Sequence, residues 1–250
     1  MSSLEWEFKE IKPLPDRHVM VIGIPDVGLV GPIATSFMVK NLKLELVGYL
    51  DSNVLPPILL FHNSEPLMPL RFYSNDENLS LFYSEIALPP EHLYSFSEYL
   101  LDFAIKRGAE RIIMLGGIAV PNRINIQKPK VYIAAIKEED RKFFSERNFP
   151  LLKEGFMGGA YASLLKQCYK KDFSGIALLA ESHLNYPDPG AAASALTMLA
   201  SILNFKIDIK PLLEQEEEIR VKLRELMKRT IESMKTSGKE YEFTVPAMYA

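Results

Sequence analysis

The chain has 250 residues, of which 48% are hydrophobic and 24% are charged, so it can bury a substantial core of ordinary globular composition. Its 29 Lys and Arg residues against 32 Asp and Glu give a formal charge of −3 without a long basic run, which argues against a nucleic-acid partner. The longest apolar runs are strand-length and far shorter than the roughly 20 residues that span a bilayer, which argues against a membrane partner.

Cysteine content and the N-terminal residues indicate the compartment. The single Cys168 excludes an intramolecular disulfide, and the first residues lack the basic and apolar regions of a signal peptide. We therefore expect a cytoplasmic protein.

Short apolar runs and helical patterns alternate in the first part of the chain. Residues 17–24 are rich in β-branched side chains and stop at a proline, as a buried parallel strand does. Residues 29–42 have helical spacing, and residues 44–50 return to strand character. Residues 67–73 and 79–86 read as a hairpin, so we expect a mixed sheet.

The same alternation continues to about residue 205. A helix over 91–107 ends at Gly108, where a left-handed cap favours glycine. The patterns further predict strands at 111–115, 131–136 and 175–180, and helices at 138–147, 159–169 and 190–205. Alternation of this kind favours an α/β fold with three layers, α/β/α, and helices on both faces of the sheet. We assign residues 1–210 to this core domain.

An amphipathic helix is predicted over residues 211–235. Pro211 suits its first turn, and acidic residues near its start and basic residues near its end match the helix dipole. Its apolar stripe either packs on the chain's own core or forms a subunit contact; the stripe consists of Leu212, Ile219, Leu223, Leu226, Thr230 and Met234.

Three glycine clusters lie at predicted strand ends or helix starts. Gly28 and Gly31 follow the first strand, but neither the dinucleotide fingerprint nor the P-loop pattern is complete there. These glycines fit tight turns and close packing, with anion binding as the alternative. The other clusters contain Gly116, Gly117, Gly158 and Gly159. Because open α/β sheets bind ligands at the carboxyl ends of their strands, the three loops could converge on one site for a phosphate-bearing or nucleoside-like molecule.

Polar side chains that could support chemistry are few. Glu181 and His183 could act as an acid/base pair, or join Asp188 in a hard-metal site. The alternative is a simple strand-to-helix connection, in which Asp188 caps the helix and Pro189 occupies its first turn. The remaining histidines and Cys168 show no zinc or nucleophile pattern, and no Gly-x-Ser-x-Gly elbow exists. We predict no catalytic residue, metal or cofactor.

Residues 236–250 have the composition of a solvated, flexible tail that ends in Met248, Tyr249 and Ala250. An apolar residue, a tyrosine and a free carboxylate suit capture of the chain end by a pocket. Burial of the two side chains contributes about 1.5 to 3 kcal/mol each, before ordering costs of several kcal/mol. One tail binds weakly, so we expect a homo-oligomer that presents several tails and gains avidity.

As an ordered set, the motifs resemble those of the proteasome assembly chaperone family, in particular its archaeal PbaA/PbaB-like homologues. The motifs are Gly23-x-Pro25-x-x-Gly28-x-x-Gly31, Leu115-Gly116-Gly117, Gly155-x-x-Gly158-Gly159, Tyr186-Pro187-Asp188-Pro189 with Ala191-Ala192, and the hydrophobic-Tyr-any end. The resemblance covers residues 18–250. It implies a nucleoside-phosphorylase-like α/β fold, homo-oligomers, and binding to the proteasome core particle.

The chain end also resembles the tails of proteasome activators, which enter pockets between α-ring subunits and present their carboxylate to a lysine. On this resemblance Met248 is the hydrophobic residue, Tyr249 the penultimate tyrosine and Ala250 the carboxylate donor. We therefore expect a proteasome-binding assembly chaperone or activator-like protein that is not an enzyme. Two alternatives stay open: a phosphate- or nucleoside-binding enzyme with its site at the glycine loops, and an oligomeric scaffold for another partner.

Overall fold

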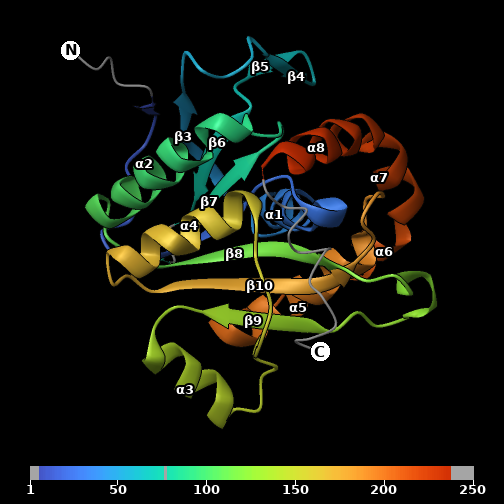
Figure 1. The fold of residues 1–250 in the computed structure, drawn as a ribbon. Helices are drawn as coiled ribbons and strands as arrows, with labels where there is room; N and C mark the ends of the chain where they lie inside the picture. The colour runs from blue at the N-terminus through green and yellow to red at the C-terminus, as the bar shows by residue number, and fades with distance from the viewer. Residues whose placement is uncertain (1–5, 76–77, 238–250) are drawn as a thin grey trace.

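An eight-stranded mixed sheet forms the centre of the computed structural model, which describes residues 6–75 and 78–237 (Figure 1). The strands lie in the order β1-β3-β6-β7-β2-β8-β10-β9, and β7, β2, β8 and β10 are parallel neighbours. The remaining pairs are antiparallel. The strands of this sheet are β1 (Glu7–Glu10), β2 (His18–Gly23), β3 (Glu45–Asp51), β6 (Leu70–Ser74), β7 (Leu79–Ser84), β8 (Ala109–Ala119), β9 (Val131–Ala135) and β10 (Gly175–Ser182).

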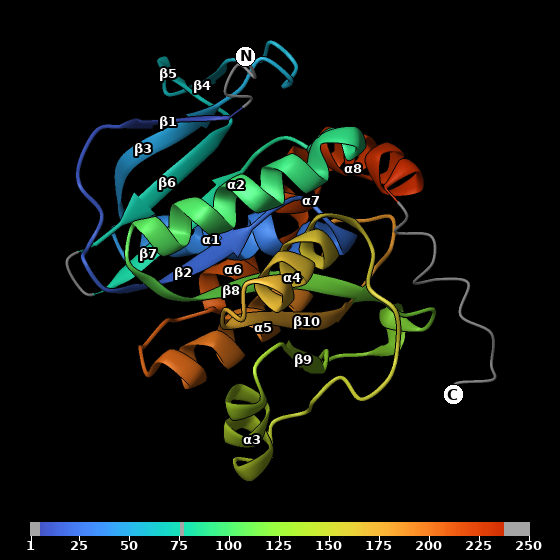
Figure 2. The ribbon, with the colours of Figure 1, turned by 60° about the vertical axis from the view of Figure 1, so that its left-hand side comes forward.

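Helices cover both faces of the sheet (Figures 1 and 2). On one face α2 (Leu93–Lys106) and α4 (Gly159–Lys170) pack side by side, and on the other α1 (Val30–Asn41) packs with α5 (Pro189–Leu203). The short α3 (Glu138–Glu146) flanks β9 at the sheet edge. The predicted three-layer α/β fold with a mixed sheet is therefore confirmed. In the part of the chain that the structure describes, no helix is both long and apolar enough to cross a bilayer.

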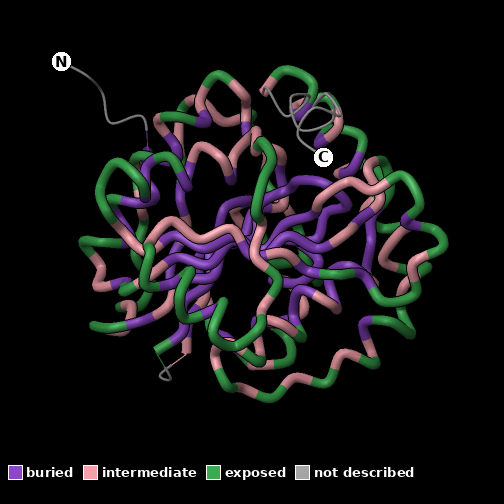
Figure 3. Tube along the Cα trace, turned by 60° about the horizontal axis from the view of Figure 1, so that its bottom comes forward, coloured by how far each residue is buried: buried purple, intermediate pink, exposed green. Residues whose placement is uncertain are grey.

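The central parallel strands are buried on both faces, as the continuous purple band through the middle of Figure 3 shows. In β2, Met20, Val21 and Ile22 are completely inaccessible to solvent. Successive side chains of a strand point to opposite faces of the sheet. When helices cover both faces, every residue of the strand must therefore be apolar. This requirement explains why β2 and β10 were predictable as unbroken apolar runs.

Three short strands were not predicted. β1 is the edge strand and pairs with β3, and its Phe8 packs against Phe72 and Phe103 with ring centroids 5.2 and 4.5 Å away. β4 (Leu60–His62) and β5 (Glu65–Leu67) form a separate hairpin beyond the main sheet. β8 is also longer than predicted, because it continues through Gly116 and Gly117 in register with β10.

The single helix predicted over residues 211–235 is instead three helices in succession, α6 (Lys210–Glu214), α7 (Glu216–Lys222) and α8 (Arg224–Thr236). They follow a curved path over the layer that contains α1 and α5 (Figure 1). Leu212, Met227 and Met234 enter the core, and Thr230 is buried beside them. The apolar stripe thus packs on the chain's own core, and the interruptions let separate segments follow that curved surface. The division into core, helix and tail stays a prediction.

His18, at the start of β2, generates a prediction about pH. The side chain is 1% exposed, its Nδ1 lies 2.9 Å from the Pro15 carbonyl oxygen, and its Nε2 has no hydrogen-bond partner among the described residues. Burial lowers the pKa of His18 from its ordinary value of 6.5. A lowered native pKa favours the neutral ring, so this contribution to stability is complete above about pH 6.5 and is lost as the pH falls from there through the lower native pKa.

We expect part of the decline in unfolding free energy between about pH 7.5 and 5 to disappear in His18→Gln, since glutamine does not titrate. Urea unfolding of both proteins across this range measures the difference in slope. Parallel pH profiles for the two proteins would contradict the role assigned to His18.

Candidate functional site

The carboxyl ends of the parallel strands β2, β8 and β10 meet at one edge of the sheet. Three connections start there: residues 24–29 after β2, residues 120–130 after β8, and residues 183–188 after β10. η1 (Val27–Leu29) and η3 (Arg123–Asn125) are short 3₁₀ turns within the first two. Because open α/β sheets place ligands at this edge, it is the first place to look for a site.

A buried ion pair between Arg123 and Asp188 joins two of these connections. Arg123 donates from Nε to Asp188 Oδ2 over 2.7 Å and from Nη2 to Oδ1 over 2.8 Å. Asp188 is fully buried and Arg123 is 8% exposed. Two parallel hydrogen bonds between charged groups fix both the distance and the orientation of the partners.

The same carboxylate serves further backbone groups. Asp188 accepts from the Ala191 backbone N at 2.9 Å, which confirms it as the cap of α5, and from the His183 backbone N at 3.1 Å. Its own backbone N donates to the Gly28 carbonyl oxygen over 2.8 Å, which ties in the connection after β2. One residue therefore links all three connections, and its oxygens are occupied by protein donors.

Glu181 and His183 are not drawn into this cluster as an acid/base pair. Glu181 accepts from the Lys130 backbone N at 2.9 Å and lies 3.5 Å from the Tyr132 hydroxyl, on the side of β9. The His183 ring packs edge-on against Tyr186, and burial lowers the pKa of His183. Within residues 6–75 and 78–237, no three His, Cys, Asp or Glu side chains are grouped so that they could hold a metal.

Tyr161 on α4 is a second organising side chain, and the sequence did not single it out. Its hydroxyl accepts from the Ile24 backbone N at 2.9 Å and lies 2.6 Å from the Leu115 carbonyl oxygen, to which it donates. The residue is 1% exposed, and burial raises the pKa of Tyr161 well above its ordinary value. Its position two residues after the Gly158-Gly159 pair is the feature of the sequence that could have pointed to it.

The predicted loop glycines allow these close approaches. A Cβ on Gly31 would lie 2.5 Å from the Tyr161 hydroxyl, and one on Gly116 would lie 2.8 Å from the Tyr161 ring. A Cβ on Gly117 would lie 2.5 Å from a backbone oxygen. Gly28 has a φ of +62° and a Cβ there would lie 1.9 Å from the Ser182 hydroxyl. Protein atoms fill the space beside all four positions.

The third cluster opens α4. Gly158 has extended backbone at the N-cap of that helix, and Gly159 has a φ of +73° at its first residue. Together with the contacts of the other four glycines, this geometry fits the close-packing interpretation of the loops. Binding of a phosphate or nucleoside at Gly28, Gly31, Gly116, Gly117, Gly158 and Gly159 stays a prediction.

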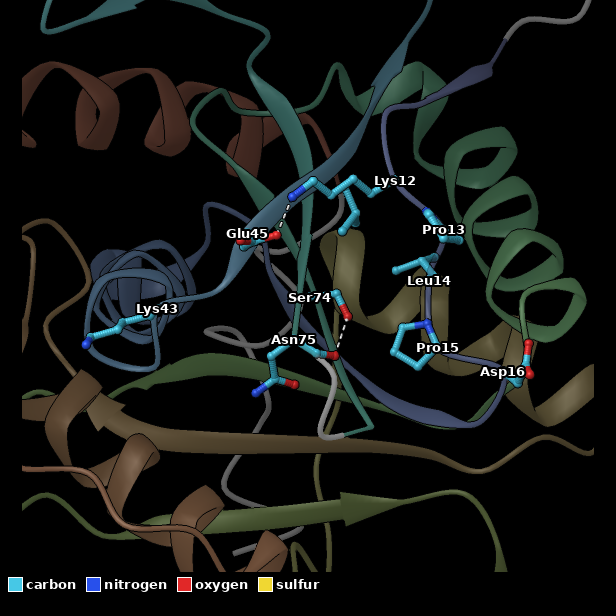
Figure 4. A pocket seen from close by; sticks show the side chains of 10 residues that line it. Lys12, Pro13, Leu14, Pro15, Asp16, Lys43, Glu45, Ser74 and Asn75 are labelled. Carbon is cyan, nitrogen blue, oxygen red and sulfur yellow. Dashed lines mark hydrogen bonds and ion pairs between the residues drawn. The ribbon is translucent and has the colours of Figure 1, made fainter.

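A cavity of about 670 Å³ lies at the opposite edge of the sheet, where β2 and β7 begin (Figure 4). Several of its polar groups bind one another: Lys12 pairs with Glu45, and the Ser74 hydroxyl lies 3.2 Å from the Asn75 carbonyl oxygen (Figure 4). In Figure 4 Lys43 points away from the wall formed by Pro13 and Leu14. The cavity therefore presents no convergent set of donors to a ligand.

The remaining predicted site residues, Met248, Tyr249 and Ala250, lie outside the described residues. The described chain ends at Ser237, just after α8.

Comparison with known proteins decides the family. The sequence matches the PAC2 family over residues 20–227. The chain belongs to the PAC2 family. An uncharacterised protein of Methanocaldococcus jannaschii, MJ0106, is 30% identical over 229 residues, which cover 90% of this chain and 92% of that protein. The region that matches the family, residues 20–227, contains Arg123, Tyr161, Asp188 and the three glycine clusters.

Solved PAC2-like structures share the fold. Pyrococcus furiosus PbaA, described as an archaeal homologue of proteasome-assembly chaperone, superposes with a TM-score of 0.84 at 30% identity and covers 91% of this chain and 99% of its own. P. furiosus PbaB, described as an archaeal proteasome activator, gives a TM-score of 0.74 at 24% identity, with 90% and 99% coverage. The predicted resemblance to this family is confirmed.

We expect a double-mutant cycle to reveal strong coupling between Arg123 and Asp188. Asp188→Asn keeps a cap acceptor but leaves a buried guanidinium without a counter-charge, which should cost about 3 kcal/mol of unfolding free energy. Arg123→Met combined with Asp188→Asn should cost less than the sum of the single changes by about 1 kcal/mol or more. Urea unfolding measures all four proteins, and strictly additive losses would show that the pair does not act as a unit.

Removal of the Tyr161 hydroxyl should leave a buried backbone donor and acceptor unpaired. We expect Tyr161→Phe to lower the unfolding free energy by about 1 to 3 kcal/mol. The matched control, Tyr169→Phe on the same helix, alters a side chain that is 76% exposed and should change it by less than about 0.5 kcal/mol. Equal effects of the two substitutions in chemical denaturation would refute the role of Tyr161.

Proposed function

We propose that this PAC2-family protein is a cytoplasmic homo-oligomer that binds the proteasome core particle, as an assembly chaperone or an activator-like factor. The observation that carries the proposal is the likeness to PbaA at 30% identity across 91% of the chain, together with the Met248-Tyr249-Ala250 ending. The likeness to PbaB, at 24% identity, shows a shared fold and does not by itself support a shared function. The proposal requires no reaction.

In the proposed mechanism the last three residues dock in pockets between α subunits. The Met248 and Tyr249 side chains supply apolar contact, and the Ala250 carboxylate pairs with a cation in the pocket. Residues 238–250 follow α8, and 13 extended residues reach at most about 45 Å, so the tail could enter a pocket while the folded body stays outside the ring.

Oligomerisation is part of the proposal because a single tail of this kind gains little net free energy. Docking of one tail restricts rotation about many backbone bonds, which costs conformational entropy. The free energy gained in return comes from the burial of only two large side chains. When several tails belong to one particle, docking of the first raises the effective concentration of the others, which strengthens attachment without new contacts. Light scattering of the purified protein should therefore give a mass of several chains.

Retention on immobilised core particles from the same organism tests the tail. We expect deletion of residues 248–250, or Tyr249→Ala, to lower the retained amount about tenfold or more, because each removes an apolar anchor that acts in every copy. Tyr241→Ala is the matched control, since it removes a tyrosine from the same tail but not from its end. Undiminished retention of the truncated chain would reject docking through the tail.

A further inference from the structure

The β4–β5 hairpin stands apart from the main sheet and has an unpaired strand edge (Figures 1 and 2). Among the described residues, β4 pairs only with β5, and the hairpin contacts the body where His62 Nε2 lies 3.3 Å from Glu85 Oε2. A two-stranded hairpin alone is marginally stable in water, whereas three or more strands with an apolar face are stable. The free edge of β4 is therefore a place where another strand can add.

The turn of the hairpin fixes which backbone groups of β4 face outward. The two connecting residues, Asn63 and Ser64, both have positive φ, 51° and 68°, as a two-residue type I′ turn requires. The pair of residues next to such a turn is hydrogen-bonded, and hydrogen-bonded pairs then alternate with pairs that are not. Phe61, which lies opposite Pro66 in the second pair, therefore directs its N–H and C=O away from β5.

The side chains along this edge are apolar and exposed. Phe61 is 67% exposed, and Leu59, two residues earlier, is 51% exposed. Alternate residues of an extended segment share a face, so these two side chains lie on the same side of the hairpin. A groove of about 430 Å³ adjoins Leu59, and residues 54–61 carry no charge. Exposed strand edges usually carry charged side chains that prevent pairing, and this edge lacks them.

The same edge of a second copy complements it. Two β4 strands placed antiparallel about a two-fold axis at Leu60 pair Phe61 of each copy with Leu59 of the other. Both of these positions face away from β5, so the register forms four backbone hydrogen bonds between the copies and gathers the four side chains on one face. Because residues 54–61 are uncharged, no like charges meet at the axis.

Pro66 limits the assembly to two hairpins. The merged sheet has four strands, and its outer edges are the two β5 strands. At the position of β5 that faces outward, Pro66 has no N–H to donate to a further strand. The contact therefore closes as a pair and does not grow into a fibre.

We propose that the free edge of β4 is a two-fold contact between copies of this chain, in which the hairpins of two copies merge into one four-stranded sheet. The proposal deepens the homo-oligomer of the proposed function by naming one of its contacts, and it rests on that function in this respect alone. Docking on the proteasome is not needed for the contact, which is a property of the isolated protein.

Disulfide crosslinking of the full-length protein tests the register. In Leu60→Cys the two thiols meet at the axis in a pair without hydrogen bonds, where Cα atoms lie about 4.5 Å apart, within reach of a disulfide. Phe61→Cys is the matched control, because it lies about 7 to 8 Å from its own copy on the diagonal, which is too far. Cys168 is buried, and burial raises its pKa to about 12, so it stays unreactive. With oxidised glutathione, we expect the crosslinked fraction of Leu60→Cys on non-reducing gels to exceed that of Phe61→Cys about fivefold or more.

Sedimentation equilibrium of the full-length protein tests the association itself. Phe61→Glu places a carboxylate from each copy beside the axis, so we expect the mass of the particle to fall to about half of the wild-type value. Phe156→Glu is the control, since it changes another exposed phenylalanine, 57% exposed and remote in sequence, and should leave the mass unchanged. Circular dichroism checks that both variants fold.

Equal crosslinking of the two cysteine variants, or an unchanged mass of Phe61→Glu, would overturn the contact. The failure of this proposal is distinct from failure of the proposed function. A wild-type oligomer that Phe61→Glu leaves intact would reject only the contact, whereas a wild-type mass of one chain would reject the homo-oligomer as well. Retention on core particles is a separate measurement that these variants do not decide.

Discussion

The buried contact between Asp188 and Arg123 fixes the edge of the sheet on which the rest of the structure depends. Asp188 caps α5, binds Arg123 with both oxygens and holds the backbone of Gly28. A buried carboxylate is costly without such partners, so each of them constrains the position of the others. The connections after β2, β8 and β10 consequently form one rigid unit.

This unit also positions Tyr186 and Pro187, which line a groove of about 540 Å³ beside α7 and α8. Tyr186 and Pro187 stand immediately before Asp188, so the contacts of the carboxylate set the place from which they face α7 and α8. On the other side of the sheet Tyr161 locks α4 to the connection after β2 through Ile24 and to strand β8 through Leu115. Gly31 and Gly116 leave room for the Tyr161 side chain. This close packing explains why both positions are glycine without a bound ligand.

Local rules predicted much of the fold because the relevant signals are themselves local. Buried parallel strands must be apolar on both faces, as in residues 175–180, and helix ends need particular residues, as at Asp188 and Gly108. β1 escaped prediction because Phe8 is its only apolar residue among three charged ones, and that ring is partly buried only through the distant Phe72 and Phe103. Its strand state is imposed by tertiary contacts.

The candidate site was less predictable for the same reason. Arg123 and Asp188 are 65 residues apart, and nothing local in the sequence indicates that they pair. Neither Gln215 nor Leu223, where the predicted C-terminal helix is interrupted, is a glycine or proline. The curved surface beneath these helices decides where they bend, and that surface exists only in the folded protein.

The central claim is that the folded body carries the tail and the tail makes the contact with the proteasome. A cryo-electron microscopy map of the full-length protein bound to core particles tests it most directly. The account predicts density for Tyr249 and the Ala250 carboxylate in pockets between α subunits, with the α/β bodies above the ring. A complex held together by the surfaces of those bodies, with the pockets empty, would contradict it.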